Sequence, residues 1–94
     1  MGFFSSDSRK MVTKSEWAKV RSTLYFTHHF SESLLDRLEE DMRGNMDREY
    51  DGYRGVDTYE LNKLVIMLRE KLVPKDIISS DQVETFEEEM TKYI

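Results

Sequence analysis

The fold is decided by residues 47–72, DREYDGYRGVDTYELNKLVIMLREKL, where an acidic loop with two glycines leads into the most apolar helical pattern of the chain. In this pattern apolar residues recur every three or four positions, which places them on one face of an α-helix. The stripe consists of Leu61, Leu64, Val65, Leu68 and Leu72. Pro74 cannot continue the helical hydrogen-bond ladder. The sequence therefore predicts a helix from Thr58 to Val73.

A second apolar stripe lies nearly opposite the first on the same predicted helix, and it consists of Tyr59, Ile66 and Val73. A helix that is apolar on two sides is either enclosed by its neighbours or carries half of an interface. In a chain of 94 residues, which has few other helices, we favour the enclosed position. The alternative makes the second stripe a surface for a protein partner or for self-association.

Four helix starts share one design, in which an apolar residue precedes the capping residue and a second apolar residue follows five positions after the first. The four segments are Val12–Trp17, Phe30–Leu35, Val56–Leu61 and Ile78–Val83. In all but the second, a Glu or Gln three positions after the cap completes a capping box. Each segment begins an apolar stripe of helical period, so the sequence predicts four helices.

The predicted fold is a small all-α domain in which two helical hairpins pack around the third helix. The helices are expected at about residues 14–28, 32–43, 58–73 and 80–92. Gly44 is expected to end the second helix, which leaves a connection of residues 44–56 that is longer than usual between bundle helices. Residues 1–11 show no apolar period and are expected to form a flexible tail. Residues 12–94 are expected to form one domain.

The composition excludes several classes of protein. The chain has no cysteine, so it has no disulfide and no thiolate metal site. Its net charge of −5 argues against general nucleic-acid binding, which depends on neutralising phosphates. No segment approaches the roughly 20 apolar residues that a membrane helix needs. We therefore expect no nucleic-acid partner, no membrane partner and a cytoplasmic location.

Charge is unevenly distributed along the chain. Residues 1–30 carry five Lys and Arg residues against two acidic residues, which gives +3 there and −8 in the rest of the chain. The simplest interpretation is internal, with a basic first helix lying near an acidic last helix. The carboxylates of that last helix are expected to lie mainly outside, and they are Glu84, Glu87, Glu88 and Glu89.

One motif in the chain suggests metal chemistry. Asp47, Glu49 and Asp51 occupy alternate positions, and Gly52 follows at once. This half of the loop resembles that of an EF-hand, in which carboxylates at alternate positions before a glycine give calcium several oxygen ligands on a tight turn. The resemblance of this half of the loop implies a calcium site.

The second half of the loop supports the same comparison. Val56 lies four residues before Glu60, and the apolar residues of the next helix follow. Residues 42–68 thus resemble an EF-hand helix–loop–helix with a two-residue insertion between the halves of the loop. The resemblance implies calcium as the one cofactor, in a structural or switch site. Its ligands would be Asp47, Glu49, Asp51 and Glu60.

Asp57 and Glu60 also have a structural explanation that needs no metal. As the N-cap and third residue of the predicted helix, their side chains would satisfy each other's backbone N–H groups. In that interpretation the acidic loop is a helical connector without a cofactor. The sequence leaves both interpretations open.

No pattern in the chain indicates an enzyme. It has no glycine-rich phosphate loop, no nucleophile motif and no His-Glu-x-x-His, and its many carboxylates lie in helical runs typical of solvated faces. Small helical domains commonly act by offering an apolar helix face to a partner. We therefore expect a non-enzymatic protein-interaction or regulatory module, with a calcium-binding EF-hand-like domain as the alternative.

Overall fold

A computed structural model describes residues 11–47 and 55–94, except for the side chains of residues 44–47. Its helices are α1 (Lys14–Phe26), α2 (Glu32–Asp47), α3 (Thr58–Met67) and α4 (Ser80–Thr91), and a π-helical turn, η2 (Leu68–Leu72), continues α3. No extended strand occurs within the described ranges. The prediction of a small all-α domain with four helices is confirmed.

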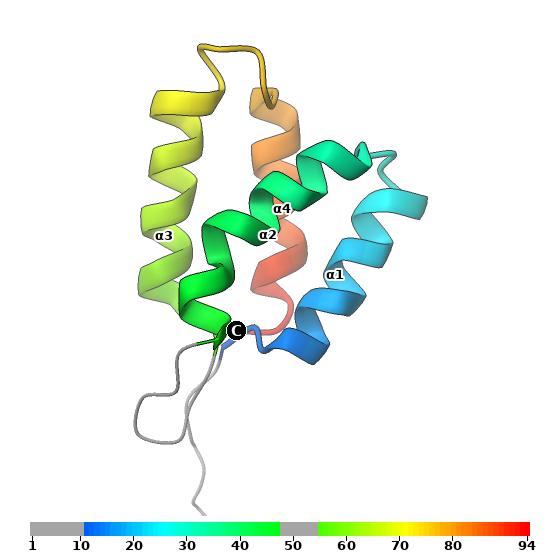
Figure 1. Cartoon of the computed structure of the whole chain (residues 1–94), viewed down its shortest axis with the longest axis vertical. Helices are drawn as coiled ribbons and strands as arrows, with labels where there is room; N and C mark the ends of the chain where they lie inside the picture. The colour runs from blue at the N-terminus through cyan, green and yellow to red at the C-terminus, as the bar shows by residue number, and fades with distance from the viewer. Residues whose placement is uncertain (1–10, 48–54) are drawn as a thin grey trace, which may run out of the picture.

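The helices form two hairpins, α1–α2 and α3–α4 (Figure 1). α4 packs against α3 and η2 of its own hairpin and also against α1 of the other hairpin. α2 packs against α1 and runs obliquely across the view of Figure 1. α4 thus joins the two hairpins. The favoured prediction that the third helix is enclosed on both sides is wrong, because Tyr59 and Ile66 on the side of its second stripe are exposed.

The four helix starts have the predicted construction. In each, the apolar residue before the cap and the one five positions later are both buried, and the pairs are Val12 and Trp17, Phe30 and Leu35, Val56 and Leu61, and Ile78 and Val83. Complete capping boxes occur at three of the starts. At the fourth, the Leu34 N–H donates to Ser31 Oγ at 3.2 Å. All eight apolar side chains belong to one hydrophobic core.

The second helix does not end at Gly44, so that prediction is wrong: α2 continues to Asp47. A glycine inside a helix costs about 1 kcal/mol relative to alanine. Four side chains earlier in α2 are buried in the core, namely Leu34, Leu35, Leu38 and Met42. Each fully buried side chain of this kind contributes about 1.5–3 kcal/mol. The cost of one glycine is small enough for α2 to continue through Gly44, and the connection to α3 is therefore shorter than predicted.

The first helix ends two residues earlier than predicted. α1 stops at Phe26, and His29 then adopts a φ of 61°, in the left-handed region. The Phe30 N–H donates to the Leu24 carbonyl at 2.9 Å. This turn reverses the chain direction so that Phe30, the apolar residue that opens the next helix start, is buried.

The third helix changes from α-helical to π-helical hydrogen bonding near its end. In η2 the Val73 N–H donates at 2.9 Å to the carbonyl of Leu68, five residues earlier, rather than four. Pro74 follows, and in a regular α-helix its ring would clash with the carbonyl four residues before it. A turn closed by bonds over five residues turns less per residue than an α-helix. Side chains after Leu68 are therefore rotated relative to those of α3.

α1 lies against α4, as the charge distribution predicted. The rings of Trp17 and Phe86 meet edge to face, with centroids 6.4 Å apart. A hydrogen bond of 3.3 Å between His28 Nε2 and Glu89 Oε2 also crosses this contact. Burial alone would raise the pKa of Glu89, but hydrogen bonds from Lys92 and His28 outweigh it and lower that pKa. Glu89 is thus half-buried and paired rather than solvated.

An antiparallel β-bridge ties the residues before α1 and α3 together. The N–H of each residue donates to the carbonyl of the other, at 2.8 Å from Val12 to Val56 and 2.9 Å in the reverse direction. Gly55 precedes this bridge with a φ of 156°. A Cβ there would lie 2.7 Å from the Val12 carbonyl oxygen and 2.8 Å from Met11 Sδ. The close approach of the two segments therefore requires glycine at this position.

We predict that Gly55→Ala destabilises the protein by more than about 1 kcal/mol, because the added methyl group meets backbone and the φ is unfavourable for any other residue. The free energy of unfolding from urea denaturation, followed by far-ultraviolet circular dichroism, measures the effect. A variant as stable as the wild type would show that the bridge does not constrain Gly55.

Candidate functional site

The second apolar stripe is only partly exposed. Tyr59 and Ile66 are 68% and 55% exposed, and Lys63 lies between them on the helix with its Nζ 5.2 Å from the centre of the Tyr59 ring. We call Tyr59, Lys63 and Ile66 the outer face of α3. Val73 is half-buried and packs against the core. It leaves the predicted stripe because η2 rotates it away from the side that carries Tyr59 and Ile66.

The candidate calcium ligands are only partly visible in the structure. Asp47 is the last residue of α2, with its side chain outside the described part, and Glu49 and Asp51 lie outside the described residues altogether. Glu60 is described, and it lies in the first turn of α3. The calcium prediction for this loop therefore stays a prediction.

Glu60 has the capping role that the sequence offered as an alternative to metal binding. Its Oε1 accepts a hydrogen bond from the Asp57 N–H at 3.0 Å, and Asp57 Oδ1 accepts one from the Glu60 N–H at 2.9 Å. Among the described residues, no group of three or more His, Asp or Glu side chains is arranged to hold a metal ion. In this arrangement, the two carboxylates satisfy backbone donors at the start of α3.

Asp41 on α2 has a carboxylate oxygen, Oδ2, that is buried without a hydrogen bond from the described residues. Arg37 Nε lies 3.8 Å away, which is too far for a hydrogen bond. Burial raises the pKa of Asp41, and the positive charge of Arg37 offsets only part of that effect. Charged Asp41 therefore costs the folded state free energy at neutral pH.

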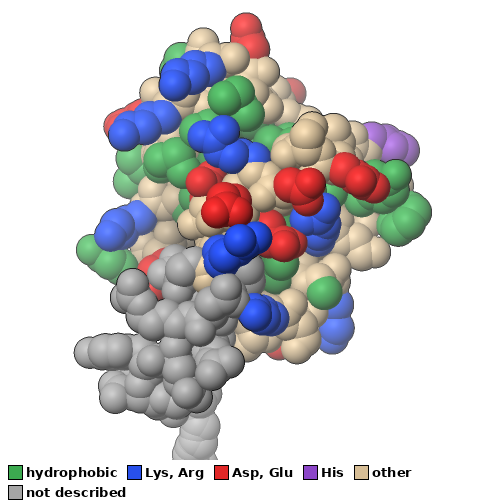
Figure 2. Space-filling model, viewed as in Figure 1, with side chains coloured by type: hydrophobic (Ala, Val, Ile, Leu, Met, Phe, Trp, Pro, Cys, Tyr) green, Lys and Arg blue, Asp and Glu red, His purple; other side chains and the backbone are tan. Residues whose placement is uncertain are grey.

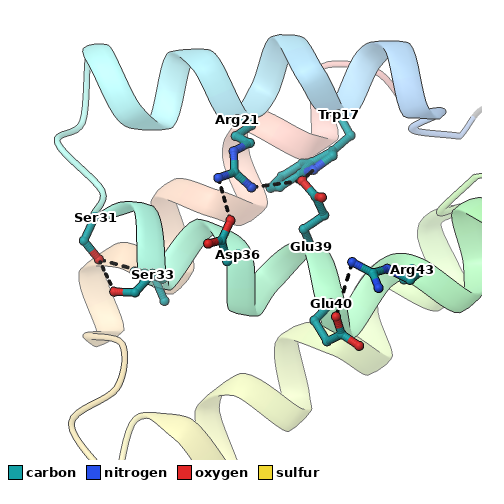
Figure 3. Close-up of polar contacts among 9 residues, drawn as sticks. Trp17, Arg21, Ser31, Ser33, Asp36, Glu39, Glu40 and Arg43 are labelled. Atoms are coloured by element: carbon teal, nitrogen blue, oxygen red, sulfur yellow. Dashed lines mark hydrogen bonds and ion pairs between the residues drawn. The ribbon is translucent and has the colours of Figure 1, made fainter.

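A polar network links α1 to α2 (Figure 3). Glu39 Oε1 accepts hydrogen bonds from Trp17 Nε1 at 2.8 Å and from Arg21 at 2.9 Å. Arg21 also donates to Asp36 Oδ1 at 2.7 Å. The hydrogen bond to Asp36, together with that to Glu39, raises the pKa of Arg21 above its ordinary value. The network satisfies the indole N–H of the buried Trp17 and fixes the spacing of the two helices.

A groove runs beside this network between α1 and α2. Its volume is about 370 Å³, and its lining residues, which define the α1–α2 groove, are Ala18, Arg21, Ser22, Tyr25, Phe26, Glu32 and Leu35. Phe26 is 73% exposed and meets Tyr25 edge to face, with ring centroids 4.9 Å apart. Figure 2 shows hydrophobic side chains beside acidic ones at this end of the molecule. The groove combines an apolar lining with an acidic border.

Sequence reasoning did not identify the α1–α2 groove or the role of Glu39. Glu39 belongs to the helical runs of carboxylates that the sequence predicts on solvated faces. A buried Trp17 needs an acceptor for its N–H, and this need was the available signal. The signal for the groove was Phe26, a large apolar residue outside the stripe of Trp17, Val20 and Leu24. Both features depend on how α2 crosses α1.

Comparison of the chain with protein-family models, with curated proteins and with solved structures finds no match. None of the described helices has both the length and the apolar character required to cross a bilayer. The function must therefore be inferred from the surfaces described above.

We predict that Asp41→Asn is more stable than the wild type at pH 7, by less than about 1 kcal/mol, because it removes a partly buried charge and loses only a weak ion pair. The raised pKa sets the pH dependence. The cost of charged Asp41 is fully present above its folded-state pKa, and it disappears below the ordinary pKa of about 3.8.

The measurement is urea denaturation of both proteins from pH 7 down to pH 3.5. The two free energies of unfolding should approach each other as the pH falls. A variant that is less stable at pH 7 would indicate that Asp41 has a favourable partner outside the described residues.

Proposed function

We propose that this protein is a non-enzymatic interaction or regulatory module that binds a protein partner through the outer face of α3. The observation that carries the proposal is the exposure of Tyr59 and Ile66 on a helix whose other side is already packed into the core. A second copy of the chain is the partner that can be tested directly. A cytoplasmic location, with no nucleic-acid and no membrane partner, remains the prediction from composition.

The outer face of α3 has the composition of a helix that docks in a groove. Tyr59 and Ile66 are seven residues apart, the spacing of two anchors in helix-in-groove recognition. Tyrosine is enriched among the residues that dominate binding energy, since it buries a large area with few rotatable bonds. Lys63 adds a positive charge next to both anchors. These features suit a partner that offers an apolar groove with acidic borders.

We predict that the wild-type protein associates as its concentration rises and that Tyr59→Ser/Ile66→Ser stays monomeric, because the double variant removes both apolar anchors of the face. Sedimentation velocity from about 10 μM to 1 mM measures the effect. Ile77→Ser is the matched control, since Ile77 is also an exposed apolar residue, at 38%, but lies in the turn before α4.

The control variant should associate like the wild type. If Tyr59→Ser/Ile66→Ser associates as strongly as the wild type, the outer face of α3 is not the binding surface. Thermal unfolding followed by circular dichroism checks that each variant is folded, which is expected because the substituted side chains are exposed.

Calcium binding in residues 47–60 is the second candidate function. The observation that favours it is the extension of α2 to Asp47, which makes the connection start at the first candidate ligand and end at the helix that carries Glu60. This arrangement has the helix–loop–helix order of an EF-hand. Under this alternative Glu60 would both cap α3 and serve as a ligand, and Asp47, Glu49 and Asp51 would complete the site.

We predict that Glu60→Gln retains the stability of the metal-free protein, because glutamine also serves at the third position of a capping box. Calcium binding would show as shifts of the amide NMR signals of residues 55–60 at millimolar calcium or below. The same variant would remove those shifts, because it loses a charged ligand. An unchanged wild-type spectrum at millimolar calcium ends the calcium alternative.

A further inference from the structure

We propose that the α1–α2 groove of one molecule receives the outer face of α3 of a second copy, so that molecules associate head to tail. This inference rests on the proposed function and adds the surface that the outer face of α3 binds. The two surfaces belong to different hairpins. One molecule therefore carries both halves of the contact.

The apolar parts of the two surfaces match in kind. The α1–α2 groove has small side chains at Ala18 and Ser22 and larger ones at Tyr25, Phe26 and Leu35. The small side chains leave space for the groove, and the larger ones form its walls. Its volume of about 370 Å³ lies in the range of sites that accept inserted groups rather than flat contacts. Tyr59 and Ile66 of a second copy are exposed apolar side chains available to enter it.

The charges of the two surfaces are opposite. At the groove, the charge of Arg21 is compensated by Asp36 and Glu39, and Glu32 at the border has no ion-pair partner among the described residues. The groove and its network thus carry a negative excess. On the other surface, Lys63 lies between the two apolar anchors.

η2, which follows α3 in the chain, carries two more exposed basic side chains, Arg69 and Lys71, and one exposed acidic side chain, Glu70. Figure 2 shows basic side chains among hydrophobic ones on the side of the molecule that α3 forms. Opposite charges around two apolar patches favour pairing of unlike surfaces and disfavour pairing of two copies of the same surface.

The geometry of such a contact has a consequence for the assembly. A contact between two different surfaces leaves one free groove and one free α3 face at the ends of every pair. Further molecules can add at both ends until the assembly closes into a ring or continues as a chain. The average mass of the wild-type protein should then rise beyond twice the monomer mass of 11.2 kDa.

The test mixes two variants that each retain one surface. Tyr59→Ser/Ile66→Ser keeps the α1–α2 groove, and Phe26→Ser/Glu32→Lys keeps the outer face of α3. Each variant alone should be monomeric up to about 1 mM in sedimentation velocity, because each lacks half of the contact. An equimolar mixture should form a heterodimer that stops at two molecules, since only one productive contact is possible.

The expected binding in the mixture is at least tenfold stronger than the self-association of either variant, and it should weaken as sodium chloride is raised from 50 to 500 mM. Ile77→Ser, which keeps both surfaces, is the matched control and is measured alone. It should associate with itself like the wild type.

Two results would overturn the inference. If Phe26→Ser/Glu32→Lys associates like the wild type and both assemblies stop at a dimer, two α3 faces pair with each other. The proposed function then stands, and the head-to-tail contact is wrong. If the wild-type protein stays monomeric at 1 mM, both the contact and the self-association are wrong.

Amide NMR of the unmodified protein supplies a readout that does not depend on the variants. Concentrating it should broaden signals in both residues 18–35 and residues 59–71. Broadening confined to residues 59–71 would contradict the contact.

Discussion

The fold depends on the apolar pairs that bracket its helix starts. A helix cap contributes about 1 kcal/mol, whereas each fully buried aliphatic or aromatic side chain contributes about 1.5–3 kcal/mol. The cap fixes where a helix begins, but the two flanking apolar residues fix where that beginning lies in the core. Both apolar residues of the pair are buried at all four helix starts, so the same arrangement positions the N-terminus of each helix. The positions of these helix starts in turn determine which helix faces remain on the surface.

The helix starts were also the part of the fold that the sequence predicted best. Caps and their flanking apolar residues act within six positions, so their effect can be judged from local sequence. The buried stripe from Leu61 to Leu72 was predictable for the same reason, because a helical period is a local property. The all-α class follows directly from these two signals.

Features that depend on distant residues were missed or placed wrongly. The local preference of Gly44 predicts a helix end, but a glycine inside a helix costs only about 1 kcal/mol and α2 continues to Asp47. A regular helix up to Pro74 predicts Val73 on the same stripe as Tyr59 and Ile66, but η2 changes the direction in which Val73 points. Glu39 was assigned to solvent because its partners, Trp17 and Arg21, lie on another helix.

The candidate sites also differ in whether their residues lie on one helix or on two. Tyr59 and Ile66 could be grouped from sequence because they share one helix, although the sequence favoured an enclosed position for them. The α1–α2 groove arises only when two helices cross. The calcium hypothesis falls between these cases, since its acids are close in sequence but only Glu60 has a described side chain. For this chain, surfaces built on one element can be read from sequence, and surfaces between elements need the structure.

The bridge between Val12 and Val56 makes the motion of the two hairpins measurable. These residues stand at the entrances to α1 and α3, one in each hairpin, and both side chains are fully buried. Any opening that separates the hairpins at this end must break the two backbone hydrogen bonds between them. The exchange rates of these two amide hydrogens with solvent therefore follow the separation of the hairpins, and a ligand that holds them together would slow both rates by the same factor.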